Sequence, residues 1–316
     1  MSRSKDTRAG RRIRSRSIES KTWRMPFATV ATGRRLFYER GGAPSESSPS
    51  LLFIDGTGSD LRDGSGQRRI AALEKMGFDV IVFDHRGLGR SADPADTRAD
   101  RWTMADFADD AAGLINVLLP DGRSCHVVGW SFGGMVAQEL AVRHPSLVQR
   151  LVLACTSAGG KAGASFPLHE LEDLPETERA ARMIGLLDTR DEPTDAAIAR
   201  ALEFAAAARA REAATPGAAV GKELQLAARA AHDTTGGLPG LTCRALVVSG
   251  ENDGIAPAEP VGRALAALVA GSRFQTFAGG HLLLKFGDVE QQAWEAIANF
   301  LLHEPGDEDA LCGCFF

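Results

Sequence analysis

The sequence predicts an α/β protein with a mostly parallel central sheet, helices on both faces and a helical insertion. Over residues 25–156 short apolar stretches alternate with segments of helical periodicity, which is typical of parallel strands joined by crossover helices. The alternation stops over residues 157–241 and resumes over residues 242–303. A strand–turn–helix pattern surrounds Ser131. We therefore expect one core, split in sequence, with the insertion lying over the carboxyl edge of the sheet, where ligands bind in such folds.

The first part of the core contains most of the expected strands. Between Phe27 and Arg40 two short strands are expected to pair around Thr32-Gly33. Four short apolar runs bounded by turn residues predict buried strands at Leu51–Ile54, Val80–Phe83, Cys125–Val128 and Leu151–Cys155. Helices are expected over Gln67–Lys75, from Thr103 to Leu118 and directly after Ser131.

The second part of the core repeats this order after the insertion. It predicts a strand at Ala245–Val248, a helix at Glu259–Val269, a strand at Arg273–Phe277 and a helix at Val289–Leu302. The insertion itself is Ala-rich, helical in pattern and broken at Pro193, Pro216 and Gly217. It is expected to form a helical cap.

Composition excludes several classes of protein. The 316 residues are 44% apolar and 24% charged, which suits a globular protein with a sizeable core. The net charge of −5 argues against a nucleic-acid partner, and without an apolar run of 18 residues no membrane span is expected. The five cysteines form neither a disulfide framework nor a zinc pattern, so we expect a reducing, cytoplasmic location. They are Cys125, Cys155, Cys243, Cys312 and Cys314.

Both ends of the chain are expected to be flexible tails. Residues 1–24 are rich in Arg and Ser and nearly free of apolar residues, which predicts disorder. A solvated tail is favoured over an organelle transit peptide as the interpretation of this stretch. Residues 304–316 are acidic and then apolar, and they do not match the prenylation pattern.

The stretch Val127–Gly134 reads Val-Val-Gly-Trp-Ser-Phe-Gly-Gly and predicts a nucleophile elbow. A serine at the apex of such a turn has a strained backbone and a projecting hydroxyl. Gly129 and Gly133 are needed because side chains there would collide across the turn. The amide of Phe132 opens the next helix, where unpaired N–H groups favour negative charge.

A serine nucleophile needs a base, and the base needs an acid that fixes its tautomer. Asp253 and His281 each follow an expected strand, so they belong to the same sheet edge as Ser131. Their order along the chain, serine, acid and histidine, suits this kind of triad. Glu251 is the alternative acid. His85 also follows a strand but precedes the serine, and packing in its loop is the favoured interpretation.

An oxyanion hole requires two donors. The amide of Phe132 is one candidate, and the loop after Leu51–Ile54 is expected to supply the other through Thr57. Gly56 and Gly58 keep this backbone open; a plain glycine turn is the alternative.

Apolar residues near the site predict a substrate pocket for a small or medium acyl group, although core packing is the alternative role. The candidates are Trp130, Phe166, Met183 and Leu187. The expected substrate is a small-molecule ester or lactone, and neither a metal nor a cofactor is required.

These motifs resemble those of the α/β-hydrolase superfamily of serine hydrolases, from roughly Phe27 to His303. Asp84–Ser91 is similar to the Asp-x-Arg-Gly-x-Gly-x-Ser loop of that superfamily. The loops of Asp253 and His281 look most like those of enol-lactonases, cofactor-free haloperoxidases and esterases. The resemblance implies two-step acyl transfer. One departure is Asp55-Gly56 where such relatives carry His-Gly, which affects the shape of the oxyanion loop more than catalysis itself.

Other functions stay open at this point. The same triad can open lactones, cleave a carbon–carbon bond in a ring-fission product or carry out perhydrolysis. Dehalogenase and epoxide-hydrolase chemistry needs a carboxylate at the elbow, where this chain has Ser131. A non-catalytic binding protein of the same fold would be expected to have lost part of the triad.

Overall fold

The computed structural model describes residues 26–42, 48–119, 122–285 and 289–303. In these ranges an eight-stranded sheet runs in the order β1-β2-β4-β3-β5-β6-β7-β8. The pairs β1–β2 and β2–β4 are antiparallel, and the pairs from β4 to β8 are parallel. The strands are β1 Phe27–Thr29, β2 Arg35–Gly41, β3 Ser50–Ile54, β4 Asp79–Phe83, β5 Cys125–Trp130, β6 Val148–Ala154, β7 Arg244–Gly250 and β8 Arg273–Phe277.

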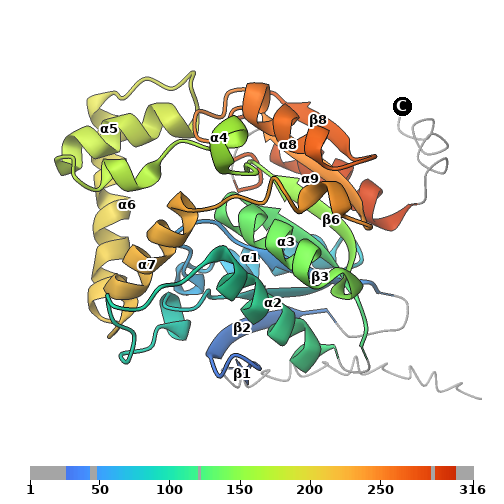
Figure 1. The fold of residues 1–316 in the computed structure, drawn as a ribbon. Coiled ribbons are helices and arrows are strands. Elements are labelled where there is room, and N and C mark those ends of the chain that lie inside the picture. The colour runs from blue at the N-terminus through green and yellow to red at the C-terminus, as the bar shows by residue number, and fades with distance from the viewer. Residues whose placement is uncertain (1–25, 43–47, 120–121, 286–288, 304–316) are drawn as a thin grey trace, which may run out of the picture.

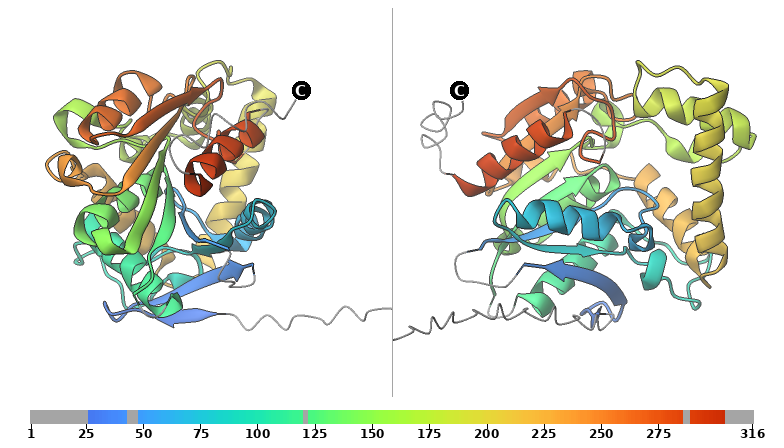
Figure 2. Two further views of the ribbon diagram at one scale, coloured as in Figure 1. Left: turned by 90° about the vertical axis from the view of Figure 1, so that its right-hand side faces the viewer. Right: turned by 180° about the vertical axis from the view of Figure 1, so that it is seen from behind.

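Helices cover both faces of the sheet, as the alternating pattern predicts (Figures 1 and 2). They are α1 Ser65–Glu74, α2 Met104–Leu118, α3 Phe132–Arg143, α4 Gly160–Gly163, α5 Glu176–Leu187, α6 Asp195–Ala213, α7 Ala218–Ala230, α8 Arg263–Leu268 and α9 Glu290–Leu302. One core cluster packs α2, α3 and α8 against the strands, and a second packs α1 and α9 against the opposite face. Alternate residues of β3 confirm the two faces, since Leu52 and Ile54 belong to the first cluster and Leu51 and Phe53 to the second. The predicted fold class is therefore confirmed.

Several predicted boundaries differ from the structure by a few residues, and the helix expected from Glu259 differs most. The segment Ala258–Gly262 is interrupted at Glu259, which has an extended backbone (φ −120°, ψ 125°), and α8 itself begins at Arg263. Pro260 disfavours a helical conformation at the residue before it.

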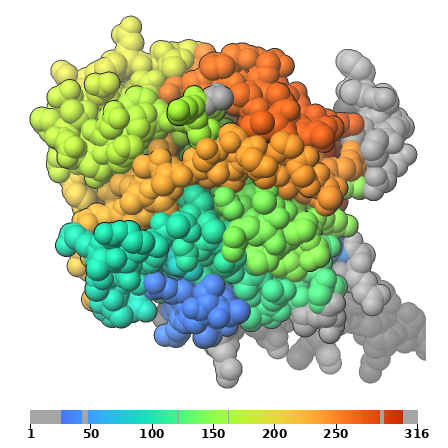
Figure 3. Space-filling view, in the orientation of Figure 1, coloured from blue at the N-terminus to red at the C-terminus, as the bar shows by residue number. Residues whose placement is uncertain are grey.

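The insertion, residues 157–241, contains α4 to α7 and joins β6 to β7. Figure 1 shows α5, α6 and α7 gathered at one end of the molecule and α4 beside α8, and in Figure 3 the surface of the insertion is continuous with that of the core. None of the helices in the described ranges is long and apolar enough to cross a membrane.

Candidate active site

Ser131 stands at the sharp turn between β5 and α3. Its backbone has φ 56° and ψ −120°, a conformation that is costly for any residue with a side chain. The turn is secured at both ends: the Ser131 amide donates to the Ala154 carbonyl at 2.9 Å, and the Ser131 carbonyl accepts from Thr156 Oγ1 at 2.7 Å. A Cβ at Gly129 would overlap the Gly133 carbonyl, which is the collision expected from the sequence.

The structure brings Ser131, His281 and Asp253 together at the carboxyl edge of the sheet. His281 Nε2 lies 2.9 Å from Ser131 Oγ, and His281 Nδ1 lies 2.8 Å from Asp253 Oδ2. All three residues are at most 5% exposed. Because Nδ1 faces a carboxylate, it carries the proton of the neutral ring, and the Nε2 lone pair faces the serine hydroxyl.

The orientation of Asp253 is set by its own loop. Its second oxygen, Oδ1, accepts hydrogen bonds from the amides of Ile255 and Ala256, both at 2.8 Å. Glu251, the alternative acid, is exposed and accepts a hydrogen bond from Thr276 instead. His85 is also occupied elsewhere, with Nε2 at 3.0 Å from the Asp55 carbonyl.

A buried thiol accompanies the acid and the histidine. Cys155 follows β6 with φ 48°, and its Sγ, an Asp253 oxygen and a His281 nitrogen lie within 4.8 Å of one another. Such spacing also suits a metal, but the carboxylate and the imidazole already bond to each other. Burial, and then the nearby Asp253 charge, raise the pKa of the thiol well above its usual value, so that it stays protonated. No pattern in the sequence indicates this contact.

The loop after β3 carries the second predicted oxyanion donor. In the described part of the chain, neither the Thr57 amide nor the Phe132 amide has a hydrogen-bond partner. The next amide, Gly58 N–H, donates to Gln225 Oε1 of α7 at 2.8 Å. Gln225 is fully buried, and neither its Nε2 nor Thr57 Oγ1 has a partner among the described residues. Gln225 is a residue that sequence reasoning missed.

Asp55 is anchored by two cations. Arg69 Nη1 lies 2.9 Å from Oδ2, Lys285 Nζ lies 3.1 Å from Oδ1, and the Gly56 amide donates to Oδ1 at 2.7 Å. Burial by itself would raise the pKa of Asp55, but Lys285, Arg69 and the Gly56 amide together hold it well below its usual value. The departure from His-Gly thus places a buried anion, with its own counterions, at the base of the oxyanion loop.

Trp130, a predicted pocket residue, packs behind the site. Its indole belongs to the core cluster of α1 and α9, and its Nε1 donates to the His281 carbonyl at 2.9 Å. The structure therefore gives Trp130 a place in the support of the histidine loop rather than in a pocket wall.

The other pocket candidates lie in the insertion and are half-buried. The end of α5 contacts both loops of the site through its backbone. The Leu187 carbonyl accepts from the His281 amide at 2.6 Å, and the Leu186 carbonyl accepts from the Gly254 amide at 3.0 Å. Met183 lies one turn earlier in the same helix. Phe166 donates its amide to the Ile255 carbonyl at 2.7 Å, beside the acid.

Comparisons with curated proteins give two relatives with different activities in their names. A 2-hydroxymuconate semialdehyde hydrolase of Pseudomonas sp. (strain CF600) is 36% identical over 120 residues, which cover 38% of this chain and 39% of that protein. A Serratia proteamaculans (strain 568) protein, provisionally named carbamate hydrolase RutD, is 36% identical over 121 residues, which cover 37% of this chain and 41% of that protein. The chain thus matches about two fifths of the length of these relatives.

Solved structures match over much more of the chain. A hydrolase from Pseudomonas aeruginosa PA01 has a TM-score of 0.67 and 26% identity, covering 90% of this chain and all of that one. The enol-lactonase from Burkholderia xenovorans LB400 has a TM-score of 0.64 and 23% identity with the same coverage, a likeness that shows the fold alone. The profile of the alpha/beta hydrolase fold matches residues 49–288. The resemblance expected from the motifs is thus confirmed, and the chain belongs to the α/β hydrolase fold family.

Proposed function

We propose that this hydrolase cleaves a carboxylic ester or lactone through an acyl-enzyme formed on Ser131. The observation that carries the proposal is the unbroken hydrogen-bonded series from Ser131 Oγ through His281 to Asp253, at 2.9 and 2.8 Å. A hydroxyl that faces an imidazole lone pair can lose its proton as it attacks, and the carboxylate stabilises the imidazolium that forms.

The reaction proceeds in two steps, formation of the acyl-enzyme and its hydrolysis. Ser131 Oγ attacks the carbonyl carbon while its proton passes to His281 Nε2, and the amides of Thr57 and Phe132 stabilise the oxyanion. His281 then protonates the leaving oxygen as the C–O bond breaks, which leaves the acyl-enzyme. A water molecule repeats the attack, its proton passes to His281 and then to Ser131 Oγ, and the carboxylic acid departs.

The insertion, residues 157–241, acts as a cap in this proposal. Phe166, Met183 and Leu187 contribute its apolar lining beside the loops of Asp253 and His281. The substrate is a small molecule, the chain needs no cofactor, and the enzyme works in the cytoplasm.

The second candidate reaction is cleavage of a carbon–carbon bond on the same triad. It is favoured by the likeness to the 2-hydroxymuconate semialdehyde hydrolase, which shares 36% identity in the matched region. Both reactions require Ser131 and His281. The type of bond that is cleaved therefore depends on which substrate the pocket accepts.

Labelling with a fluorophosphonate, which reacts with activated serines, tests the nucleophile. Wild-type protein should be labelled and Ser131→Ala should not, whereas Ser65→Ala, a change of a serine at the start of α1, should leave labelling intact. Rates of hydrolysis are then measured on a panel of short and long aryl esters, a lactone and a vinylogous 1,5-diketo acid. Their comparison shows which type of bond is cleaved fastest. A folded Ser131→Ala variant that is still labelled or active would refute the proposal. A folded wild type that is neither labelled nor active on the panel would favour a binding protein.

A further inference from the structure

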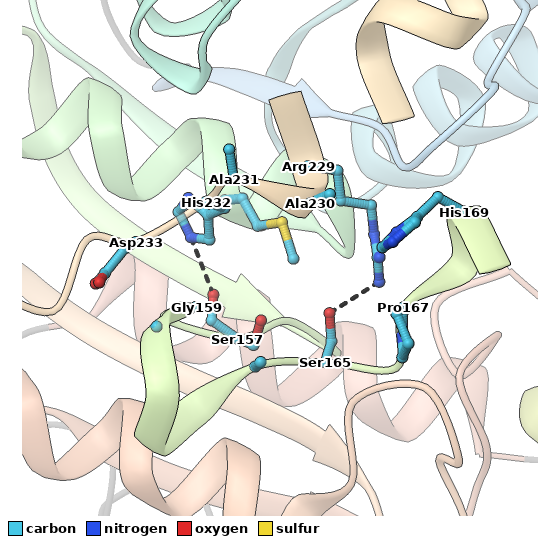
Figure 4. A pocket seen from close by; sticks show the side chains of 13 residues that line it. Ser157, Gly159, Ser165, Pro167, His169, Arg229, Ala230, Ala231, His232 and Asp233 are labelled. Carbon is cyan, nitrogen blue, oxygen red and sulfur yellow. Dashed lines mark hydrogen bonds between the residues drawn. The ribbon is translucent and has the colours of Figure 1, made fainter. Parts of the chain in front are cut away.

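A cavity of about 350 Å³ lies between the first segment of the insertion and the end of α7 (Figure 4). Arg229 and His232 enter it from the α7 side, and Ser157 and Ser165 lie on the opposite wall. Met135 of α3 also lines it. Met135 follows Ser131 by four residues, about 6 Å along the helix axis, so α3 connects the elbow to a wall of this cavity.

Arg229 is a buried cation without an acidic partner in the described part of the chain. It is 5% exposed, and its Nη2 donates to Ser165 Oγ at 2.8 Å and to the Phe166 carbonyl at 2.9 Å. Its Nε is buried without a partner, and among the described residues no acceptor bonds to Nη1. Burial lowers the pKa of Arg229 to about 10, so the group is still charged at neutral pH. A buried charge is costly unless something pairs with it.

The other polar atoms of the wall also lack partners. Within the described ranges, Ser157 Oγ and His232 Nδ1 are buried and make no hydrogen bond, while His232 Nε2 faces the Ser157 carbonyl at 3.3 Å. Burial lowers the pKa of His232 to about 4, which makes this ring neutral at pH 7. The acidic side chain on the wall, Asp233, is exposed and accepts hydrogen bonds from Thr235. The buried part of the wall therefore offers one positive charge and a hydroxyl donor.

We propose that this cavity binds a carboxylate on the substrate, with Arg229 as its counterion, while the scissile carbonyl lies at Ser131. This inference rests on the proposed function and names its substrate class, an ester or lactone that carries a carboxylate. A planar guanidinium pairs well with a carboxylate, and a single buried cation matches a monoanion better than a phosphate dianion.

Two aryl esters of equal chain length test the charge requirement. We expect p-nitrophenyl hemiglutarate to be cleaved with a higher kcat/KM than p-nitrophenyl pentanoate. Arg229→Met should lower the ratio of the two values about 10- to 100-fold, the effect of losing a charge-assisted hydrogen bond, and Arg229→Lys should lower it less. Lys222→Met is the matched control, because Lys222 lies on the same helix, pairs with Glu172 and makes no contact with the cavity.

Calorimetry with glutarate on the Ser131→Ala protein gives a readout that needs no turnover. Glutarate should bind, more weakly as salt is added, and Arg229→Met should abolish the binding. An unchanged ester ratio in a folded Arg229→Met protein, or tighter Arg229-dependent binding of inorganic phosphate than of glutarate, would overturn the carboxylate assignment. If both esters were hydrolysed at the same rate and glutarate did not bind, the carboxylate site would be refuted, while the proposed hydrolase activity would stand. If glutarate bound in an Arg229-dependent way but neither ester was hydrolysed, the proposed hydrolase activity would be refuted, while the carboxylate site would stand.

Discussion

Lys285 Nζ lies 3.1 Å from Asp55 Oδ1, so an ion pair joins the loop that follows His281 to the loop that follows β3. The same ammonium lies 4.2 Å from the centre of the Trp130 ring, and Trp130 Nε1 donates to the His281 carbonyl. The loop of the base and the loop of the oxyanion donor are thus fixed to each other and to the strand that carries Ser131. A movement of either loop would change the position of the His281 base relative to the predicted oxyanion donor Thr57.

Asp55→Asn should destabilise the fold by about 3 kcal/mol, because it leaves the buried Arg69 and the nearby Lys285 without their anion. Lys285→Met should cost less, since Asp55 keeps Arg69. Both variants should lower kcat more than they raise KM. Urea denaturation and ester kinetics measure the two effects. Equal losses of stability in the two variants would contradict the predicted role of Arg69.

The pH dependence of the same variant gives a second test. Because the pKa of Asp55 is lower in the folded than in the unfolded chain, its stabilisation is present above pH 3.8 and is lost as the pH falls below that value. The wild type should therefore lose more unfolding free energy than Asp55→Asn on going to low pH. Parallel curves for the two proteins would show that the ion pairs contribute nothing.

Gly280→Ala should separate the histidine loop from α5. A Cβ at Gly280 would overlap the Leu187 carbonyl, which accepts the hydrogen bond from the His281 amide. We expect a loss of about 2 kcal/mol in stability, as in other overpacked sites, together with a fall in kcat. Differential scanning calorimetry and ester hydrolysis measure these changes.

Gly185→Ala is the matched control for that change. Gly185 lies inside α5, and a Cβ there meets no atom within 4 Å. Alanine should raise the stability of the helix by about 0.5–1 kcal/mol and leave activity unchanged. If both substitutions slowed the reaction equally, the contact between Leu187 and His281 would not be the cause.

Gln225→Leu should disturb the oxyanion loop from the insertion side. The substitution removes the acceptor of the Gly58 amide, one residue from Thr57. Because Gln225 positions the loop and does not itself supply the donor, kcat should fall about 10-fold, less than on removing an oxyanion donor. Glu223→Gln, an exposed change on the same helix, should leave kcat unaffected. A Gln225→Leu protein with unchanged kcat and raised KM would instead place this side chain in substrate binding.

The positions of Ser131, Asp253 and His281 could be predicted because each follows a strand of one parallel sheet. Strand ends are local features of the sequence, and a parallel sheet places them at one edge. The contacts of Gln225 and Lys285 could not be predicted, because each joins segments far apart in sequence. One feature of the α7 sequence nevertheless indicates that these residues have a role. Gln225 and Arg229 are polar but lie on the same helix face as Gly221 and Leu224, which is buried and where apolar residues are expected.

Trp130 shows a different limit of sequence reasoning. An aromatic residue beside a nucleophile suits a pocket wall and a core equally well, and only the packing of its ring distinguishes the two. The apolar character of Trp130 was evident, but the direction of its side chain depends on the Gly56 backbone, which leaves room for the indole.

His126 should make the stability of the fold fall at mildly acidic pH. It lies within β5, is 3% exposed, and packs edge-on against Phe78. Burial, and then the charge of Arg150, lower the pKa of His126 to about 4, so the unfolded chain binds its proton first as the pH falls from about 6.5. The stabilisation by the neutral ring is complete above pH 6.5 and is lost between pH 6.5 and 4; a shift of this size corresponds to about 3 kcal/mol. His126→Leu should flatten that part of the profile, measured by urea denaturation between pH 7 and pH 4. An unchanged profile in His126→Leu would show that another group is responsible for the acid sensitivity.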